Sequence, residues 1–122
     1  MQFKKTIKIA KDVIQYELNA LKTLKRYINN DFKKLIEVLL SIRGGKVIIS
    51  GVGKSGIIAR KWAATFSSTG TPSFFLDASN ASHGDLGQIT SNDIVILISN
   101  SGQSSELKNT ETRSQFPFLN LC

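Results

Sequence analysis

Two short runs of branched apolar residues, each leading directly into a loop of small residues, constrain the fold of this chain more than any other feature. The runs are residues 47–49 and 94–98, and neither alternates polar with apolar positions. Uninterrupted runs of this kind are typical of strands buried on both faces, which occur in parallel sheets covered by helices. A helical stretch over residues 55–68 and a further strand at residues 73–76 lie between them. This order of strand, helix, strand, loop and strand predicts an α/β fold with a parallel sheet of about three strands.

Two helices are predicted to precede the sheet. Residues 2–28 carry apolar side chains at helical spacing without a proline or glycine, which predicts one long amphipathic helix. The run 29–31 (Asn-Asn-Asp) breaks this helix and offers an N-cap, and residues 32–40 then show the spacing of a second helix, closed by Gly44 and the glycine that follows it. These helices could pack on the sheet or on a second copy of the chain.

The sequence therefore divides into three parts. The N-terminal helical region is 1–45, the sheet-forming domain is 46–109, and the tail is 110–122. The tail is polar at first and then shows no helical spacing, so it does not continue the pattern of the sheet-forming domain.

The net charge of +7 belongs to the N-terminal part alone. Residues 1–46 hold eleven Lys and Arg against four Asp and Glu, whereas the remainder holds five of each. We interpret the excess as a solvated helix face rather than a surface for nucleic acid or an acidic partner, because few aromatic residues accompany it. No apolar run reaches the ~18 residues that cross a bilayer, and Lys8 and Lys11 interrupt any signal-peptide core. These observations predict no nucleic-acid partner and no membrane partner. The single cysteine, Cys122, cannot form an internal disulfide, so we expect a cytoplasmic protein.

The first loop of small residues, 50–56, is rich in glycine and precedes a helix. Glycines let the backbone approach a ligand, the helix N-terminus offers N–H groups to an anion, and Lys54 adds a positive charge. We therefore expect a phosphate to be held by Gly53, Lys54 and Ser55.

Sequence patterns leave more than one kind of phosphate ligand open for this loop. A Walker A loop is excluded, because it needs glycine where Ile48 stands. The dinucleotide pattern Gly-x-Gly-x-x-Gly fits Gly51, Gly53 and Gly56, and Asp77 lies near the distance expected for a ribose contact. Two other interpretations of this loop stay open: a loop that binds a phosphosugar, and a turn between strand and helix that binds no ligand.

The second loop, residues 99–106, follows the third strand. Hydroxyl and backbone N–H groups at such a position can hold a phosphate without a metal. The predicted ligand-binding residues here are Ser99, Ser101, Gln103, Ser104 and Ser105. Glu106 would lie in the first turn of the next helix, where it either favours the helix dipole or acts as a general base. A dinucleotide fold gives no reason for this second loop, so the loop favours phosphosugar binding.

His83 is the only histidine and lies between the second and third strands. A lone histidine is commonly structural, but its pKa near neutrality also suits an acid or base in a pocket. No second histidine or free cysteine lies nearby, so we expect no metal site and no cofactor.

Together these motifs resemble the arabinose 5-phosphate isomerase family of SIS-domain proteins. The matching stretches, in order and spacing, are residues 50–56, 60–66, 68–75, 83–87 and 99–106. The resemblance implies a flavodoxin-like, Rossmann-like SIS sheet that binds a sugar phosphate. It implies interconversion of ribulose 5-phosphate and arabinose 5-phosphate through an enediol, a reaction that feeds the Kdo sugar of lipopolysaccharide. By position, Lys54, Glu106 and His83 match residues of the family's active site, and the serines of the second loop match its phosphate-binding loop. The resemblance also implies a homo-oligomer in which neighbouring subunits complete each site.

The sequence departs from this family in several places. Asn80 and Gln103 stand where the family carries Glu. The family's remaining SIS strands, a further Glu and His, and its pair of CBS modules have no counterpart here. We therefore expect a truncated form with an incomplete SIS sheet and doubtful activity, as a frameshift or early stop would produce. An intact downstream reading frame encoding the missing strands would support that origin.

Other functions remain open at this point. The domain could be a non-catalytic phosphosugar-binding or regulatory module, which would bind without turnover. It could be a dinucleotide-binding domain, which would bind NAD and be indifferent to Lys54→Ala. It could also be a degenerate product that does not fold stably.

Overall fold

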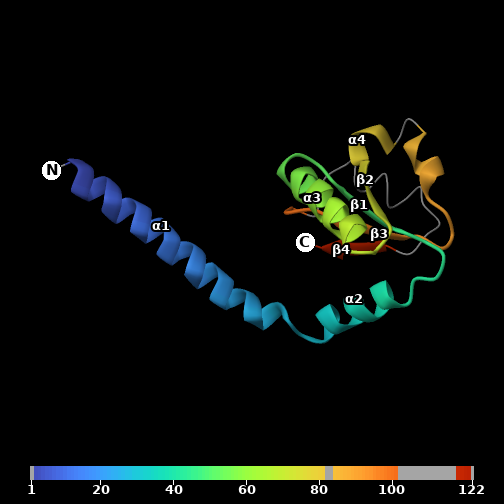
Figure 1. Cartoon of the computed structure of the whole chain (residues 1–122), viewed down its shortest axis with the longest axis horizontal. Helices are drawn as coiled ribbons and strands as arrows, with labels where there is room; N and C mark the ends of the chain where they lie inside the picture. Colours follow the sequence, from blue (N-terminus) through green and yellow to red (C-terminus); the bar gives the residue numbers. More distant parts are fainter. Residues whose placement is uncertain (1, 82–83, 102–117, 122) are drawn as a thin grey trace. The chain divides into compact units, whose positions relative to one another are not determined.

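The computed structural model describes residues 2–81, 84–101 and 118–121 (Figure 1). The chain forms two compact units, residues 1–37 and residues 38–122, and each is described by itself. The first unit is helical, and the second contains the sheet.

The first unit holds the long helix α1 (Gln2–Leu24), the 3-10 turn η1 (Lys25–Tyr27) and the first part of α2 (Asn30–Leu40). The side chain of Asn29 accepts hydrogen bonds from the backbone N–H groups of Asp31 and Phe32, at 2.9 and 3.2 Å. Asparagine is among the preferred residues for this capping role. The predicted break between two helices is therefore confirmed, and Asn29 is the residue that caps the second helix.

The second unit is built on a single parallel sheet. Its strands are β1 (Val47–Gly51), β2 (Ser73–Asp77), β3 (Ile94–Ile98) and β4 (Phe118–Leu121), in the order β2-β1-β3-β4. Every neighbouring pair is parallel. The predicted α/β fold with two preceding helices is thereby confirmed, and β1 to β3 are its predicted strands.

The number of strands is larger than we expected. We predicted about three, and β4 adds a fourth beside β3. This strand is only four residues long and directly follows Pro117, so its apolar run is too short to stand out from a loop. Pairing with β3, which sequence reasoning could not foresee, is what makes it a strand.

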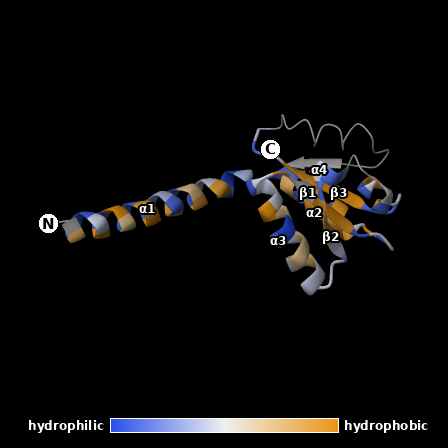
Figure 2. Ribbon diagram, turned by 90° about the horizontal axis from the view of Figure 1, so that it is seen from above, coloured by the Kyte–Doolittle hydropathy of each residue, from blue (hydrophilic) through white to orange (hydrophobic). Residues whose placement is uncertain are grey.

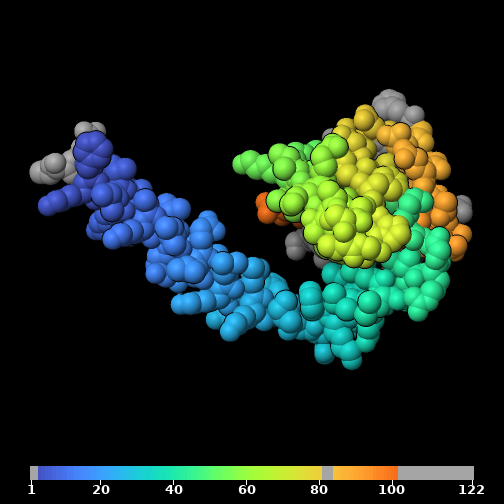
Figure 3. Space-filling view, in the orientation of Figure 1, coloured from blue at the N-terminus to red at the C-terminus, as the bar shows by residue number. Residues whose placement is uncertain are grey.

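Helix α3 (Lys54–Ser68) connects β1 to β2 and packs on the sheet (Figure 1). Its buried residues are Gly56, Ala59 and Ala63, which share one helix face and are all small. Small side chains on that face let the helix approach the strands closely. Figure 3 shows α3, in green, at the surface of the unit. Ile57 and Ile58 of this helix are exposed.

The sheet is buried on both faces, as its apolar runs predicted. Alternate residues of a strand point to opposite faces, and two clusters result. The cluster beneath α3 comprises Val47, Ile49, Ala59, Ala63, Ile94 and Ile96. The cluster on the other face comprises Ile48, Leu76, Ala78, Ile89, Val95 and Leu97. Figure 2 shows β1 and β3 among the hydrophobic segments of the chain. The short elements α4 (Ala78–Ala81) and η2 (Asp85–Gln88) contribute to this second face.

The amino ends of β1 and β3 are joined by a buried carboxylate. Asp93 is 1% exposed and accepts hydrogen bonds from the N–H of Lys46 at 2.9 Å, from the Lys46 Nζ at 3.0 Å and from the N–H of Thr90 at 2.7 Å. Burial acts to raise the pKa of Asp93, but these hydrogen bonds outweigh it and the pKa is lowered. Asp93 therefore remains ionised and fixes the end of the sheet opposite the two loops.

Candidate functional site

The carboxyl ends of three strands lie level with one another. Gly51, the last residue of β1, pairs in register with Asp77 of β2 and with Ile98 of β3. The connection from β1 leads to β2 on one side, and the chain leaves β3 toward β4 on the other. In open α/β sheets, ligands bind at the carboxyl edge where successive connections diverge in this way. The order β2-β1-β3 places that point between the loops that follow β1 and β3.

The loop after β1 is shaped by Gly53. This residue has φ of +59° and ψ of −127°, a conformation that only glycine adopts without strain. It allows the chain to turn from β1 directly into α3, which begins at Lys54. The first N–H groups of a helix have no intrahelical acceptor, so those of Lys54 and Ser55 can receive an anion. The exposed Lys54 side chain adds a positive charge at the same point.

The other two glycines of this loop serve packing. A Cβ atom on Gly56 would lie 2.7 Å from the backbone oxygen of Gly51, and one on Gly51 would lie 2.9 Å from the backbone carbon of Ser55. Side chains do not fit at either position. The Gly-x-Gly-x-x-Gly pattern is thus accounted for by one tight turn and one close contact between strand and helix, without a dinucleotide.

A cavity of about 230 Å³ opens beside this loop, between α3 and the end of β2. Its polar lining comes from Arg60, Asp77 and Ser79. The Arg60 guanidinium lies over the ring of Phe75, 4.2 Å from its centroid. Asp77 accepts hydrogen bonds from the side-chain hydroxyl and the backbone N–H of Ser79. These bonds, together with the charge of Arg60, lower the pKa of Asp77 against the opposing effect of burial.

Arg60 and Ser79 were not among the residues that we predicted for the site. Arg60 follows Gly56 by one helical turn, so its spacing from the loop could have indicated it. Ser79 comes near through the pairing of β2 with β1, which no local pattern reveals.

The predicted residues divide between those that the structure describes and those outside it. Gly53, Lys54 and Ser55 start α3 at the carboxyl end of β1. Ser99 and Ser101 follow β3, the strand beside β1, and Ser99 is half-buried whereas Ser101 is exposed. The predicted residues that lie outside the described part of the chain are His83, Gln103, Ser104, Ser105 and Glu106.

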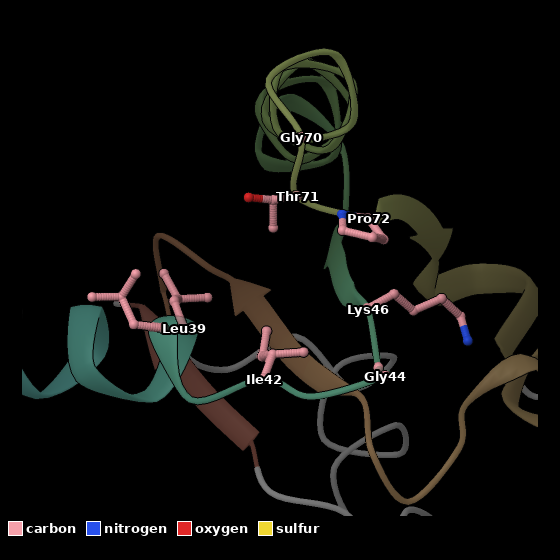
Figure 4. Close-up of a pocket in the computed structure, with 9 residues that line it drawn as sticks. Leu39, Ile42, Gly44, Lys46, Gly70, Thr71 and Pro72 are labelled. Atoms are coloured by element: carbon pink, nitrogen blue, oxygen red, sulfur yellow. The ribbon is translucent and has the colours of Figure 1, made fainter.

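A larger cavity, of about 550 Å³, lies at the opposite edge of the sheet (Figure 4). It is formed by the end of α2, the residues before β1 and the turn before β2, with Leu39, Ile42 and Thr71 among its lining residues. Its one lysine, Lys46, is already paired with Asp93. Because it faces the amino ends of the strands and carries no free charge among its described lining, it is not the candidate site.

The fold is a parallel α/β sheet with two loops of small residues at its carboxyl edge, and the chain belongs to the SIS-domain family. The family model described as SIS domain matches residues 40–111. Among curated proteins, the chain is 53% identical over 97 residues to arabinose 5-phosphate isomerase KdsD of Escherichia coli K12 and 54% identical to KdsD of Shigella flexneri. The predicted resemblance to arabinose 5-phosphate isomerases is thereby confirmed.

These matches cover 80% of this chain but only 29% of each relative, so the chain spans less than a third of the length of the curated relatives it matches. The solved structure of Escherichia coli CFT073 c3406 in complex with arabinose 5-phosphate superimposes with a TM-score of 0.87 at 45% identity. That match covers 96% of this chain and 63% of the other. Tagatose-6-phosphate ketose/aldose isomerase of Escherichia coli, at 21% identity and a TM-score of 0.60, shares the fold. No helix within the described residues is both long and apolar enough to cross a membrane.

Proposed function

We propose that this chain binds a sugar phosphate, and that arabinose 5-phosphate is its ligand, at the carboxyl edge of the sheet between the loops that follow β1 and β3. The observation that carries the proposal is the level pairing of Gly51 with Ile98, which brings the Lys54 loop beside the Ser99–Ser101 loop. A helix N-terminus and a lysine follow the first of these strand ends and hydroxyl-bearing residues follow the second, and such groups suit a phosphate monoester.

The proposed reaction is the interconversion of arabinose 5-phosphate and ribulose 5-phosphate. A base removes the proton from the carbon beside the carbonyl, the electrons form an enediol, and a proton returns to the former carbonyl carbon. Glu106 is proposed as the base, and His83 as the acid that moves the proton between oxygens. Lys54 is proposed to stabilise the negative charge that develops on oxygen. The identity to KdsD proteins supports this assignment.

The phosphate end of the substrate is assigned to the second loop. Ser99 and Ser101, followed by Gln103, Ser104 and Ser105, are proposed to donate hydrogen bonds to it. The family resemblance further supports a homo-oligomer in which a neighbouring subunit completes each site. Binding and turnover are separable under this proposal, since a chain can hold the phosphate without carrying every group that the reaction needs.

Titration calorimetry with arabinose 5-phosphate tests the proposal, with Lys54→Ala as the variant and Lys61→Ala as its matched control. Lys61 is also exposed on α3, two turns farther from the loop. Loss of a charge-assisted contact weakens binding by about 10- to 100-fold, so Lys54→Ala should lower affinity by that factor and Lys61→Ala should not. Equal affinity of wild type and Lys54→Ala would contradict the proposed site.

A dinucleotide remains the second candidate, because Asp77 does lie at the end of β2 next to the Gly53 turn. NAD in the same titration separates the two candidates. Binding of NAD that survives Lys54→Ala, with no binding of arabinose 5-phosphate, would favour a dinucleotide site. A coupled isomerase assay on the same wild-type sample then distinguishes an enzyme from a binding module.

A further inference from the structure

The cavity of about 230 Å³ beside the Gly53 turn contains polar groups that the proposed reaction does not use. They are Arg60 of α3, Asp77 at the end of β2 and Ser79 of α4. Every residue that lines this cavity belongs to the unit of residues 38–122. The cavity is therefore a property of that unit alone.

Arg60 presents hydrogen-bond donors that have no acceptor in the described part of the chain. The flat face of its guanidinium lies over the ring of Phe75, 4.2 Å from the ring centroid. A guanidinium carries its five N–H donors around its edge, so stacking on a ring leaves them available. Among the residues that the structure describes, none accepts a hydrogen bond from Arg60, which acts on Asp77 through its charge.

Asp77 presents an acceptor in the same cavity. The N–H and the hydroxyl of Ser79 both donate to Oδ1 of Asp77, at 3.0 and 2.5 Å. No donor of a described residue reaches its Oδ2, and an ionised carboxylate can accept with both oxygens. The bonds from Ser79 lower the pKa of Asp77 more than burial raises it, so the group is ionised at neutral pH.

The two charges decide which kind of group suits this cavity. An anion would meet the carboxylate of Asp77, and a cation would meet the guanidinium of Arg60. A pair of neighbouring hydroxyl groups is neutral, and each hydroxyl can both accept from Arg60 and donate to Asp77. The volume of about 230 Å³ lies below the roughly 300–1,000 Å³ of pockets for larger ligands. The cavity thus suits a hydroxyl-bearing fragment of a few carbons.

This cavity adjoins the edge of the sheet to which the ligand is assigned. Gly53 lines it and also forms the turn into α3. Asp77 pairs with Gly51, and Gly51 pairs with Ile98. Neighbouring strands lie about 4.8 Å apart, so the ends of β2 and β3, on either side of β1, are about 10 Å apart. An open-chain pentose phosphate of about eight bonds also extends over about 10 Å.

We infer that Arg60, Asp77 and Ser79 form the subsite for the hydroxyl groups of the sugar phosphate, whose phosphate lies toward the loop after β3. This inference rests on the proposed function and adds the direction of the ligand and its need for neighbouring hydroxyl groups. The carboxylate of Asp77 repels the phosphate, which favours this direction over the reverse one.

Titration calorimetry of the full 122-residue chain with arabinose 5-phosphate and with inorganic phosphate tests the subsite. Asp77→Asn keeps an oxygen that accepts from the Ser79 N–H but removes the charge. Its affinity for arabinose 5-phosphate should fall by about 10-fold or more, while its affinity for inorganic phosphate should stay equal or increase. Arg60→Lys keeps its charge but loses the planar edge, and should show the same pattern. Lys61→Ala, on the same helix, is the control and should change neither affinity.

A ligand that lacks one hydroxyl tests the same contact from the other side. 2-Deoxyribose 5-phosphate differs from arabinose 5-phosphate by the missing hydroxyl beside the carbonyl carbon. Wild type should bind it at least about 10-fold more weakly than arabinose 5-phosphate, because groups of the subsite are left without a partner. Asp77→Asn should reduce this preference to nearly none, a change that a general loss of stability does not produce.

Three results would overturn the inference, and they differ in what else they remove. If wild type and Asp77→Asn bind arabinose 5-phosphate equally, the subsite is wrong and the proposed function stands. If Asp77→Asn weakens arabinose 5-phosphate and inorganic phosphate by the same factor, Asp77 supports the fold of the whole edge and contacts no hydroxyl group. If wild type does not bind arabinose 5-phosphate at all, the proposed function and the subsite fail together.

Discussion

At the scale of single residues, three glycines shape the candidate site for two different reasons. Gly53 supplies a backbone conformation, whereas Gly51 and Gly56 supply space. The sequence pattern makes these three positions look equivalent, because the pattern alone does not reveal φ angles or backbone contacts. It therefore left a dinucleotide turn, a phosphosugar loop and an empty turn open at the same residues.

Gly53→Ala tests the conformational role. Nothing lies within 4 Å of the added Cβ, so the cost comes from the backbone alone, about 1–3 kcal/mol of unfolding free energy. Gly44, with φ of +68° and open space around it, is the matched control at the opposite edge of the sheet. Both alanine variants should lose similar stability in urea, and only Gly53→Ala should also lose affinity for arabinose 5-phosphate. Equal affinity of Gly53→Ala and Gly44→Ala for arabinose 5-phosphate would show that the conformation of the Gly53 turn does not contribute to ligand binding.

Asp93 gives the fold a defined response to acid. Its pKa is lower in the folded chain than the usual value of about 3.9. Its stabilising contribution is therefore complete above about pH 5 and disappears as the pH falls through the folded-state pKa. Asp93→Asn should cost about 1–3 kcal/mol at pH 7 and should flatten the acid limb of a plot of stability against pH. If wild type and Asp93→Asn lose unfolding free energy in parallel below about pH 5, Asp93 is not the group whose titration destabilises the fold.

At the scale of elements, the strand–helix–strand unit formed by β1, α3 and β2 positions the site. Its strands could be predicted because their apolar runs are continuous and end in loops of small residues. The start of α3 was also predicted to within one residue, from the glycine-rich turn before it. The short elements could not be predicted in the same way. The four-residue α4 and η2 are too short to show a period, and β4 depends on pairing with β3 rather than on its own sequence.

The contact between α3 and β1 can be tested through Gly56. Alanine raises helix propensity by about 1 kcal/mol relative to glycine, so an unconstrained helix would gain stability. Here the new Cβ would meet the Gly51 carbonyl oxygen at 2.7 Å, and overpacking of this kind costs about 1–3 kcal/mol. We expect a net loss in urea denaturation for Gly56→Ala. Gly87→Ala, where nothing lies within 4 Å of the added atom, should be close to neutral. A more stable Gly56→Ala chain would show that α3 can move away from the strand.

At the scale of the whole molecule, the chain combines a parallel sheet of the SIS-domain family with an N-terminal helical unit. The family could be predicted from the sequence, because several motifs recur in order over more than half of the chain. The grouping of polar side chains beside the Gly53 turn could not be predicted from the sequence. Arg60, Asp77 and Ser79 come together only when β1 and β2 are paired. The proposed general base and acid, Glu106 and His83, lie outside the described residues, and their roles stay predictions.

Thermal unfolding of the 122-residue chain, with and without millimolar arabinose 5-phosphate, tests the central claim most directly. A ligand that binds only the folded state raises the midpoint, by an amount set by its concentration relative to Kd. We predict one cooperative transition that shifts upward with arabinose 5-phosphate, does not shift with NAD, and loses its shift in Lys54→Ala. A cooperative transition that arabinose 5-phosphate leaves in place would contradict the claim that this edge of the sheet binds a sugar phosphate.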